Sequence, residues 1–410
     1  MPETRLNRRR LLAAGAGAGV AFPLLAAAAQ SAPKLRIVRL EVLVVKVNQR
    51  GDWIFVRLHT DKGVTGLGEA SQGGGFTRAS SDRNAAMQKA LGEFFELIRG
   101  ESPFEIERYR ERGRAKAKAG GRLTVTAFCA LEQAQWDLAG RALGAPVYAL
   151  LGGKLRSDLE VYANINRATN EDRSPAGFAA NAERAAEEGF QAVKAAVFDD
   201  YPPLTAPKPH LETHKELAIS RTEALRKAIG PGRKLMIDVH SHLDVPLSIE
   251  VARRLEPVNL FFYEEPINPE RLAETAEIRA AIQQTMAGGE VLFGVESFVP
   301  LCRNRALDII MPDVKHCGGI AEARKIAVVA EVDGVAVSPH NPSGPVATAA
   351  SVQLCAGLPN FLILEHAWGE VPWRADLITP PERFTAGRIA VPDGPGFGIE
   401  LNDRVVQAHA

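Results

Sequence analysis

The second half of the chain repeats one pattern, in which a short apolar run is followed by a helical stretch. From about Leu159 the runs read LEVYANI, AVKAAVF, KLMIDV, LFFYEEP, TMAGGE, LDIIMPD, GVAVSPH and FLILEH. From the third run on, polar residues close the runs at steps of 23 to 27 residues. That step is the length of one strand, one helix and two loops. The eight runs therefore predict an α/β fold, a (β/α)8-type barrel or modified TIM barrel.

Polar side chains mark the end of each repeat. The residues that set the spacing are Asp238, Glu264, Glu290, Asp313, His340 and Glu365. Each is expected at the C-terminal end of its strand, on the face where barrel enzymes build active sites. The step from Lys194 to Asp238 is longer, at 44 residues, and its excess is the proline-rich stretch FDDYPPLTAPKPHLE. We expect this insertion to overhang the site.

The residues before the barrel follow other patterns. Residues 1–32 run from arginines through a Gly/Ala/Leu stretch to small residues, which is typical of a twin-arginine-type signal peptide. We therefore expect a periplasmic protein with no membrane anchor in its mature form; a frayed alanine-rich helix is the alternative. Residues 35–150 alternate as strands do and then become helical, which predicts an α+β capping domain. The barrel is assigned to residues 151–374, and residues 375–410 are a candidate to pack with the capping domain.

Charge and cysteine usage limit the kinds of partner. Lys+Arg and Asp+Glu both total 49, so the formal net charge is zero. No surplus of charge points to nucleic acid or a membrane surface, and a small-molecule partner is expected. The cysteines are widely spaced and lie in apolar contexts, which predicts buried thiols and not a disulfide or metal site. They are Cys129, Cys302, Cys317 and Cys355.

Three carboxylates on consecutive predicted strands indicate a metal site. Asp238, Glu264 and Glu290 should converge, because neighbouring strands lie only about 4.8 Å apart. Like charges in a shared pocket need a cation, and an all-oxygen ligand set favours Mg²⁺. The alternative is that some of them form salt bridges with lysines at strand ends. The spacing selects Glu264 as the metal ligand in place of its neighbour Glu265. Strand alternation is expected to turn the side chain of Glu265 away from the site.

Two histidines are candidates for acid and base chemistry. His240 lies two residues beyond Asp238, so it should lean to the same side and reach a bound substrate. His340 and Asp313 end neighbouring strands, where the carboxylate could fix the tautomer of the imidazole and raise its basicity. A structural role is the alternative for a lone histidine. His242 lies further from the strand and is assigned to a loop.

Several stretches resemble one known family. These are WDLAGRALGAPVYALLGG, YEEP, PDVKHCGGI and SPHNPSGP. With the joint spacing of the polar residues, the chain resembles the enolase superfamily in its mandelate racemase/muconate lactonizing enzyme-like branch. The resemblance runs from about Leu35 to the end. Within that branch the chain is most similar to galactonate dehydratase-type acid-sugar dehydratases.

The resemblance implies a reaction and roles for individual residues. Asp238, Glu264 and Glu290 would bind Mg²⁺, and His340, oriented by Asp313, would be the base. His240 would be the acid, and Glu365 would hydrogen-bond the substrate carboxylate or enediolate. The implied enzyme is a hydro-lyase that takes the proton alpha to the carboxylate of a sugar acid, an aldonate such as galactonate. It then eliminates the β-hydroxyl to give a 2-keto-3-deoxy acid, and it is expected to be a homo-oligomer.

One departure from the family pattern keeps other activities open. Many relatives carry Lys-x-Lys at the end of the second barrel strand, where this chain has Lys194, Ala195 and Ala196. Lys194 would either face the substrate carboxylate or pair with a metal ligand. The alternatives are a racemase, epimerase or cycloisomerase of the same superfamily, and a non-catalytic exported acid-sugar binding protein. The two histidines of HSH also suggest a zinc amidohydrolase. In that class of enzyme, such a histidine pair lies on the first barrel strand.

Overall fold

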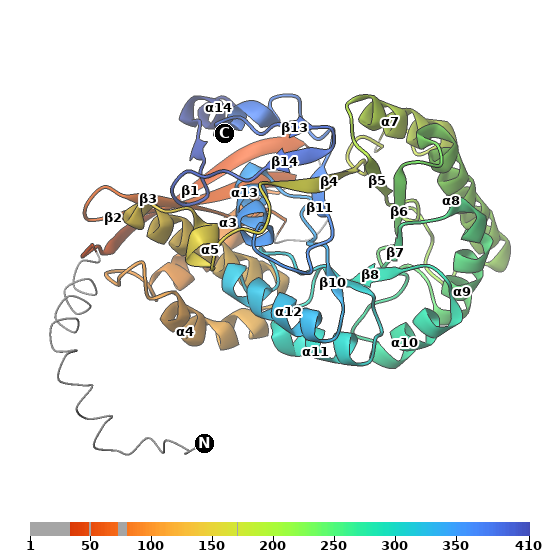
Figure 1. Ribbon diagram of the computed structural model, residues 1–410, viewed down its shortest axis with the longest axis horizontal. Helices are drawn as coiled ribbons and strands as arrows, with labels where there is room; N and C mark the ends of the chain where they lie inside the picture. The colour runs from red at the N-terminus through yellow and green to blue at the C-terminus, as the bar shows by residue number, and fades with distance from the viewer. Residues whose placement is uncertain (1–32, 49–50, 73–79, 170) are drawn as a thin grey trace, which may run out of the picture. The chain divides into compact units, whose positions relative to one another are not determined.

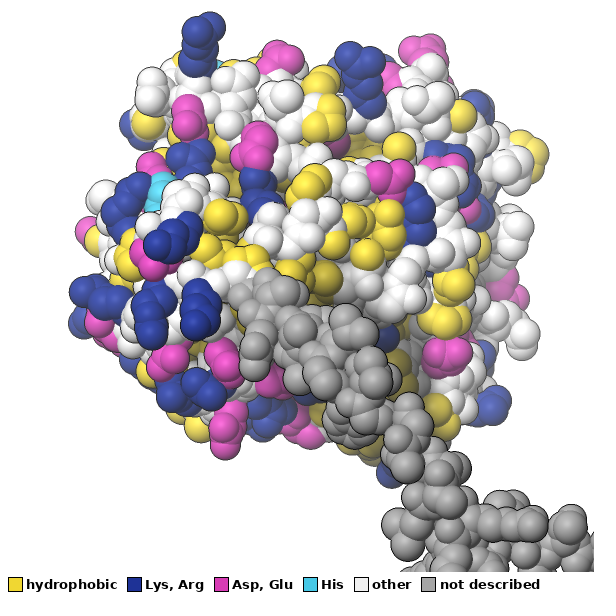
Figure 2. Space-filling view, turned by 60° about the vertical axis from the view of Figure 1, so that its left-hand side comes forward, with side chains coloured by type: hydrophobic (Ala, Val, Ile, Leu, Met, Phe, Trp, Pro, Cys, Tyr) yellow, Lys and Arg dark blue, Asp and Glu magenta, His cyan; other side chains and the backbone are white. Residues whose placement is uncertain are grey.

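A computed structural model describes residues 33–48, 51–72, 80–169 and 171–410. The expected signal peptide, residues 1–32, lies outside the described residues. Residues 36–410 form one unit, drawn from red to blue in Figure 1, and this unit is described below. Basic and acidic side chains are intermixed on the face shown in Figure 2, in keeping with the zero net charge.

The N-terminal elements combine a small sheet with three helices. An antiparallel sheet has the order β1 (Ile37–Asn48), β2 (Gly51–Thr60) and β3 (Thr65–Glu69). It packs with α3 (Ser81–Phe95) and α5 (Gly121–Leu143), and α4 (Ile106–Ala119) packs against α5. The helix α5 ends where Gly144 adopts a left-handed conformation, φ 65°, which glycine allows without a Cβ clash. Alternating apolar side chains of β2 and the apolar face of α3 share one core, as their spacing predicts.

Eight parallel strands then form the barrel. They are β4 (Asp158–Asn164), β5 (Ala192–Ala195), β6 (Lys234–Asp238), β7 (Phe262–Glu264), β8 (Met286–Gly288), β9 (Ile309–Ile310), β10 (Ala336–Val337) and β11 (Leu364–Ala367). From β4 to β10 each strand pairs with the next, and β11 pairs with β4. The ring closes where Val337 bridges in parallel to Phe361, just before β11. The predicted barrel is confirmed.

Helices follow the first seven barrel strands. They are α7 (Pro175–Glu187), α8 (Lys208–Ile229), α9 (Val245–Arg254), α10 (Leu272–Ala281), α11 (Val295–Arg303), α12 (Ile320–Val332) and α13 (Pro345–Cys355). Figure 1 shows α7 to α11 curving around the outside of the strands. Short connecting helices are α6 (Val147–Leu150) and the 3-10 turn η2 (Glu256–Val258).

The barrel is modified after its eighth strand. There the described residues form a 3-10 turn and short strands in place of a long helix. They are η3 (Arg374–Leu377), β12 (Ile378–Thr379), β13 (Phe384–Thr385), β14 (Arg388–Ala390) and β15 (Glu400–Leu401), followed by α14 (Asp403–Ala408). Lys46 of β1 donates its backbone N–H to the carbonyl of His409 at 2.7 Å. Arg57 of β2 pairs with Asp403 of α14 at 2.5 Å. The C-terminal segment therefore contacts the N-terminal sheet.

Two buried glutamates join the N-terminal elements to the barrel. Glu132 of α5 accepts hydrogen bonds from the backbone N–H groups of Ile320 and Ala321, at 2.7 and 2.9 Å, where α12 begins. Burial raises the pKa of Glu132 to about 7. Glu69, the last residue of β3, accepts backbone N–H groups of Gly344 and Ala347 at the start of α13. Free N–H groups at a helix start suit such acceptors.

Replacing Glu132 with Ala should lower the free energy of unfolding by about 2 to 5 kcal/mol, because two buried N–H groups would lose their acceptor. Unfolding in urea, followed by circular dichroism, measures the change. Glu111→Ala is the control, since Glu111 is an exposed residue on α4. Equal stability of the two variants would contradict this role for Glu132.

The four cysteines are buried free thiols, as predicted. Among the described residues, no helix combines the length and the apolar character needed to cross a bilayer.

Candidate active site

Strand alternation places charged residues directly above an apolar layer inside the barrel. Alternate residues of a strand face the same side. Met236 and Phe262 belong to a small apolar cluster of barrel residues. Asp238 and Glu264 follow two positions later on the same strands and are buried. On β5, Lys194 likewise follows the apolar residue Ala192 by two positions.

Not every predicted residue closes its strand. Asp238 and Glu264 are the last residues of β6 and β7, as expected. Glu290, Asp313 and His340 lie two or three residues beyond the ends of β8, β9 and β10, so that expectation is wrong for them. The strands end earlier because only two or three residues of each run pair with their neighbours. Glu365 lies inside β11.

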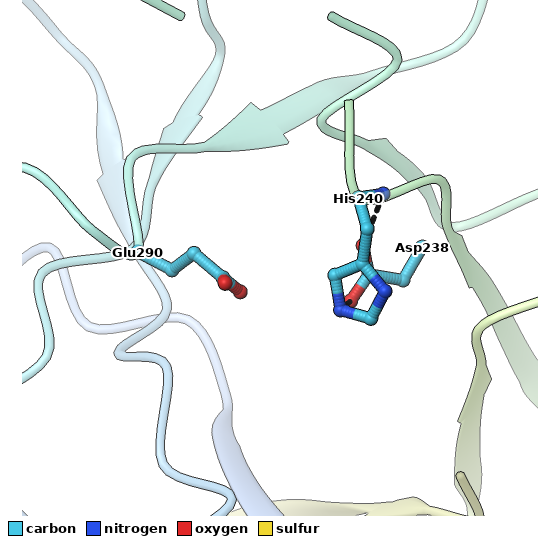
Figure 3. A group of neighbouring side chains, drawn as sticks. All are labelled: Asp238, His240 and Glu290. Carbon is cyan, nitrogen blue, oxygen red and sulfur yellow. Dashed lines mark hydrogen bonds and ion pairs between the residues drawn. The ribbon is translucent and has the colours of Figure 1, made fainter. Parts of the chain in front are cut away.

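Three side chains from opposite sides of the barrel mouth gather at one point. One possible ligand atom from each of Asp238, His240 and Glu290 lies within 4.8 Å of the others. Figure 3 shows Glu290 reaching toward the other two from the opposite side. The Oε2 atom of Glu290 is buried and accepts no hydrogen bond among the described residues, although Nε2 of His340 lies 3.1 Å away. A buried, unsatisfied carboxylate oxygen beside a second carboxylate fits a bound cation.

Glu264 is paired with a lysine. The Nζ atom of Lys194 lies 2.9 and 2.8 Å from the two carboxylate oxygens of Glu264. It also lies 3.3 Å from Asp238 and 3.0 Å from Glu365. Burial opposes the charge of Lys194, but these carboxylates, led by Glu264, outweigh it and hold the lysine pKa well above its usual value. Lys194 therefore pairs with Glu264, while the substrate-binding role of Lys194 and the role of Glu264 as a metal ligand stay predictions.

His340 and Asp313 form the predicted pair. The Nδ1 atom of His340 lies 2.7 Å from Oδ2 of Asp313. Its Nε2 atom lies 3.1 Å from Oε2 of Glu290. Burial would raise the pKa of Asp313, but the adjacent cations, led by Lys315, hold it far below its usual value. Lys315 is fully buried and donates to the same oxygen at 2.9 Å.

His240 lies on the same side as Asp238, but a turn places it there. The strand ends at Asp238, and His240 and Ser241 have positive φ angles of 50° and 60°. The His240 Nε2 atom lies 3.1 Å from Oδ2 of Asp238, and Nδ1 lies 2.5 Å from Oδ1 of Asp199. Burial disfavours the charged ring, but Asp238 and Asp199 outweigh it and hold the pKa of His240 well above the usual histidine value.

Glu265 does not turn away from the site, so that expectation is wrong. Its φ of 39° departs from strand geometry, and the side chain lines the cavity. It accepts hydrogen bonds from the N–H groups of Gly289 and Glu290. Burial and the charge of Glu290 raise the pKa of Glu265 to about 8. His242 also lines the cavity.

A cavity of about 520 Å³ opens above these groups. Its lining residues are Arg122, Asn164, Asn166, Arg167, Asp199, Asp238, His240, Ser241, His242, Glu265, Asn268, Glu290, Val291, His340 and Pro342. Amides and arginines are suited to the hydroxyls and carboxylate of a small polar acid. The sequence did not single out Arg122, Arg167 or the three asparagines, and it placed Asp199 near the site only as part of the stretch FDDYPPLTAPKPHLE. Asn164 lies near the end of the first apolar run and Asn166 directly follows that run, and this spacing of two positions could have found them.

The sequence and the fold have known counterparts. Residues 30–152 match the mandelate racemase/muconate lactonizing enzyme N-terminal domain, and residues 177–405 match the enolase C-terminal domain-like family. This chain belongs to the mandelate racemase/muconate lactonizing enzyme branch of the enolase superfamily. Membership confirms the resemblance and argues against the zinc amidohydrolase alternative.

Relatives of this enolase-superfamily chain are sugar-acid dehydratases. It is 31% identical over 378 residues to the D-xylonate dehydratase of Haloferax volcanii, covering 90% of this chain and 88% of the relative. It is 31% identical over 364 residues to the D-galactonate dehydratase of Variovorax paradoxus, covering 87% and 91%. These relatives confirm the expectation of a hydro-lyase similar to galactonate dehydratase.

Solved structures of the superfamily share the fold. A mandelate racemase/muconate lactonizing enzyme from Sulfitobacter sp. superposes with a TM-score of 0.81 at 29% identity, covering 92% of this chain and 96% of the other. A member of the enolase superfamily from Salmonella Typhimurium gives a TM-score of 0.80 at 26% identity, covering 92% and 98%.

Proposed function

We propose that this chain is a Mg²⁺-dependent dehydratase of an aldonate such as galactonate. The observation that carries the proposal is the placement of two histidines around one polar cavity. His340 lies on one side with Asp313, and His240 lies on the other beside Asp238. A base and an acid on separate sides suit removal of a proton and departure of a hydroxyl group from adjacent carbons.

His340 is the proposed base. Asp313 holds Nδ1, so the lone pair for proton abstraction belongs to Nε2, which faces Glu290. That atom takes the proton alpha to the substrate carboxylate and leaves an enediolate. Asp313 then stabilises the imidazolium that forms, and Lys315 keeps Asp313 ionised.

His240 is the proposed acid. It gives a proton to the β-hydroxyl, which leaves as water while the electron pair of the enediolate forms the carbon–carbon double bond. The resulting enol then becomes the 2-keto-3-deoxy acid by moving one proton from oxygen to carbon. Glu365 is proposed to hydrogen-bond the substrate carboxylate or enediolate, as the resemblance implies, and Lys194 lies 3.0 Å from it.

The donor set fits a hard cation. Asp238 and Glu290 offer carboxylate oxygens, including the unsatisfied Oε2 of Glu290. Glu264 is the proposed third ligand, next to Asp238 in the parallel register. A bound Mg²⁺ would supply positive charge against the negative charge that develops on the substrate carboxylate.

Incubating the protein with Mg²⁺ and a panel of aldonic and aldaric acids tests the proposal. A 2-keto-3-deoxy product from at least one aldonate is expected, measured by a colorimetric assay for 2-keto-3-deoxy acids and by mass spectrometry. If no acid gives a keto product while several raise the melting temperature, the chain is an acid-binding protein. If the acid changes only its configuration at the α-carbon, the chain is an epimerase.

A further inference from the structure

The loop after β5 brings an additional carboxylate to the site. Ala196 stands where the Lys-x-Lys pattern would have its second lysine. Three residues later, Oδ1 of Asp199 lies 2.5 Å from Nδ1 of His240. Asp199 lines the same cavity as His240, although the two residues follow different strands.

We infer that Asp199 is a positioning residue that fixes the ring of His240, so that the cavity holds a second His–Asp pair opposite His340 and Asp313. The inference rests on the proposed function, in which His240 donates a proton to the leaving hydroxyl. Asp199 acts through His240 and is not assigned a contact with the substrate.

The position of His240 explains why a second group is needed to hold it. The residue lies beyond its strand, in a turn of two consecutive left-handed residues. Its side chain is 19% exposed, whereas that of His340 is 2% exposed. Packing therefore restricts the His240 ring less than the His340 ring. A hydrogen bond from Nδ1–H to Asp199 selects one ring orientation, in which Nε2 lies 3.1 Å from Oδ2 of Asp238 at the cavity and is the nitrogen that transfers the proton.

Asp199 can serve as an anchor because the backbone around it is held. Arg221 forms two bonds with the carboxylate of Asp200, at 2.6 and 2.7 Å, and donates to the carbonyl of Val197 at 2.9 Å. Arg173 donates to the carbonyl of Ala196 at 2.8 Å. The bonds lie on both sides of Asp199 in the chain, so its carboxylate is presented from a fixed segment.

The first test needs no substrate. In a His–Asp pair the bonded ring N–H gives a proton resonance far downfield, away from other protein signals. Spectra of the full protein with Mg²⁺ should contain one such resonance that is absent from both Asp199→Asn and His240→Asn. A second should be absent from Asp313→Asn. If no far-downfield resonance depends on both Asp199 and His240, the inference is wrong.

The second test separates positioning from stability. Asp199→Asn should slow elimination of the β-hydroxyl by about 10- to 1000-fold. Exchange of the α-proton with solvent deuterium, assigned to His340, should change by less than about threefold. The melting temperature should stay within about 2 °C. Equal losses of exchange and elimination, or a large fall in melting temperature, would instead assign Asp199 a structural role.

Asp200→Asn is the matched control. It removes the neighbouring charge that binds Arg221 and leaves the contact between Asp199 and His240 in place. Because the bonds between Arg221 and Asp200 also hold the segment that carries Asp199, Asp200→Asn should lower the melting temperature and slow elimination by a smaller factor than Asp199→Asn does. The two proposals fail separately: a protein that turns over no acid would refute the dehydratase proposal, while the resonance test would still decide the position of His240.

Discussion

His340→Asn is expected to abolish exchange of the substrate's α-proton with solvent deuterium. Asn retains an amide that can donate to Asp313, but it has no basic nitrogen in place of Nε2. Loss of a general base should lower the exchange rate by about a hundred- to ten-thousandfold. Dehydration should fall by the same factor, since elimination follows proton removal. The rates are measured in deuterium oxide by proton NMR of the acid.

A surface histidine supplies the control for this substitution. His214 lies on α8, where its Nδ1 contacts the carbonyl of His210 one helical turn earlier and its ring packs against the ring of His210. His214→Asn should leave both rates unchanged. If exchange persists in His340→Asn at close to the original rate, another group is the base, and Lys194 would be the first to examine.

Glu290→Gln is expected to remove Mg²⁺ binding while leaving the metal-free protein at least as stable as before. The amide keeps the size of the side chain and removes one negative charge from the group around Asp238. Affinity for Mg²⁺ should fall by roughly a hundredfold or more. Repulsion among the buried carboxylates should also fall, so the metal-free melting temperature should stay constant or rise.

Calorimetric titration and thermal unfolding with and without Mg²⁺ measure these changes. Mg²⁺ should raise the melting temperature of the unsubstituted protein, because it binds the folded state. That rise should vanish in Glu290→Gln and persist in Glu296→Gln. Glu296 lies on α11 and pairs with Arg114 and Lys118 outside the cavity. An unchanged response of Glu290→Gln to Mg²⁺ would contradict the proposed site.

The barrel could be predicted because its geometry imposes a period on the sequence. Apolar runs about 25 residues apart reveal the strands, and alternation within a run shows which side faces inward. That reasoning correctly places Asp238 and Glu264 at the ends of β6 and β7. It also correctly brings His340 to Asp313, since the order of strands fixes which loops are neighbours.

The remaining features of the site depend on contacts that the regular spacing of the apolar runs does not reveal. The ends of β8 to β10 are set by pairing with adjacent strands, so Glu290 lies in a loop. Strand alternation predicts that the side chain of Glu265 faces away from the site, but its positive φ turns the side chain toward the cavity. Asp199 comes from an irregular segment, and Arg221, which holds that segment, lies on the following helix. The pairing of Glu264 with Lys194 is seen only in the distances, and the predicted contact of Lys194 with the substrate stays a prediction.

The most direct test of the central claim is to follow α-proton exchange and keto-acid formation in the same deuterium oxide reaction for His340→Asn and His240→Asn. His340→Asn is expected to lose both, whereas His240→Asn should lose the keto acid and still exchange the proton. If the two variants behave identically, the assignment of base and acid to separate histidines is wrong.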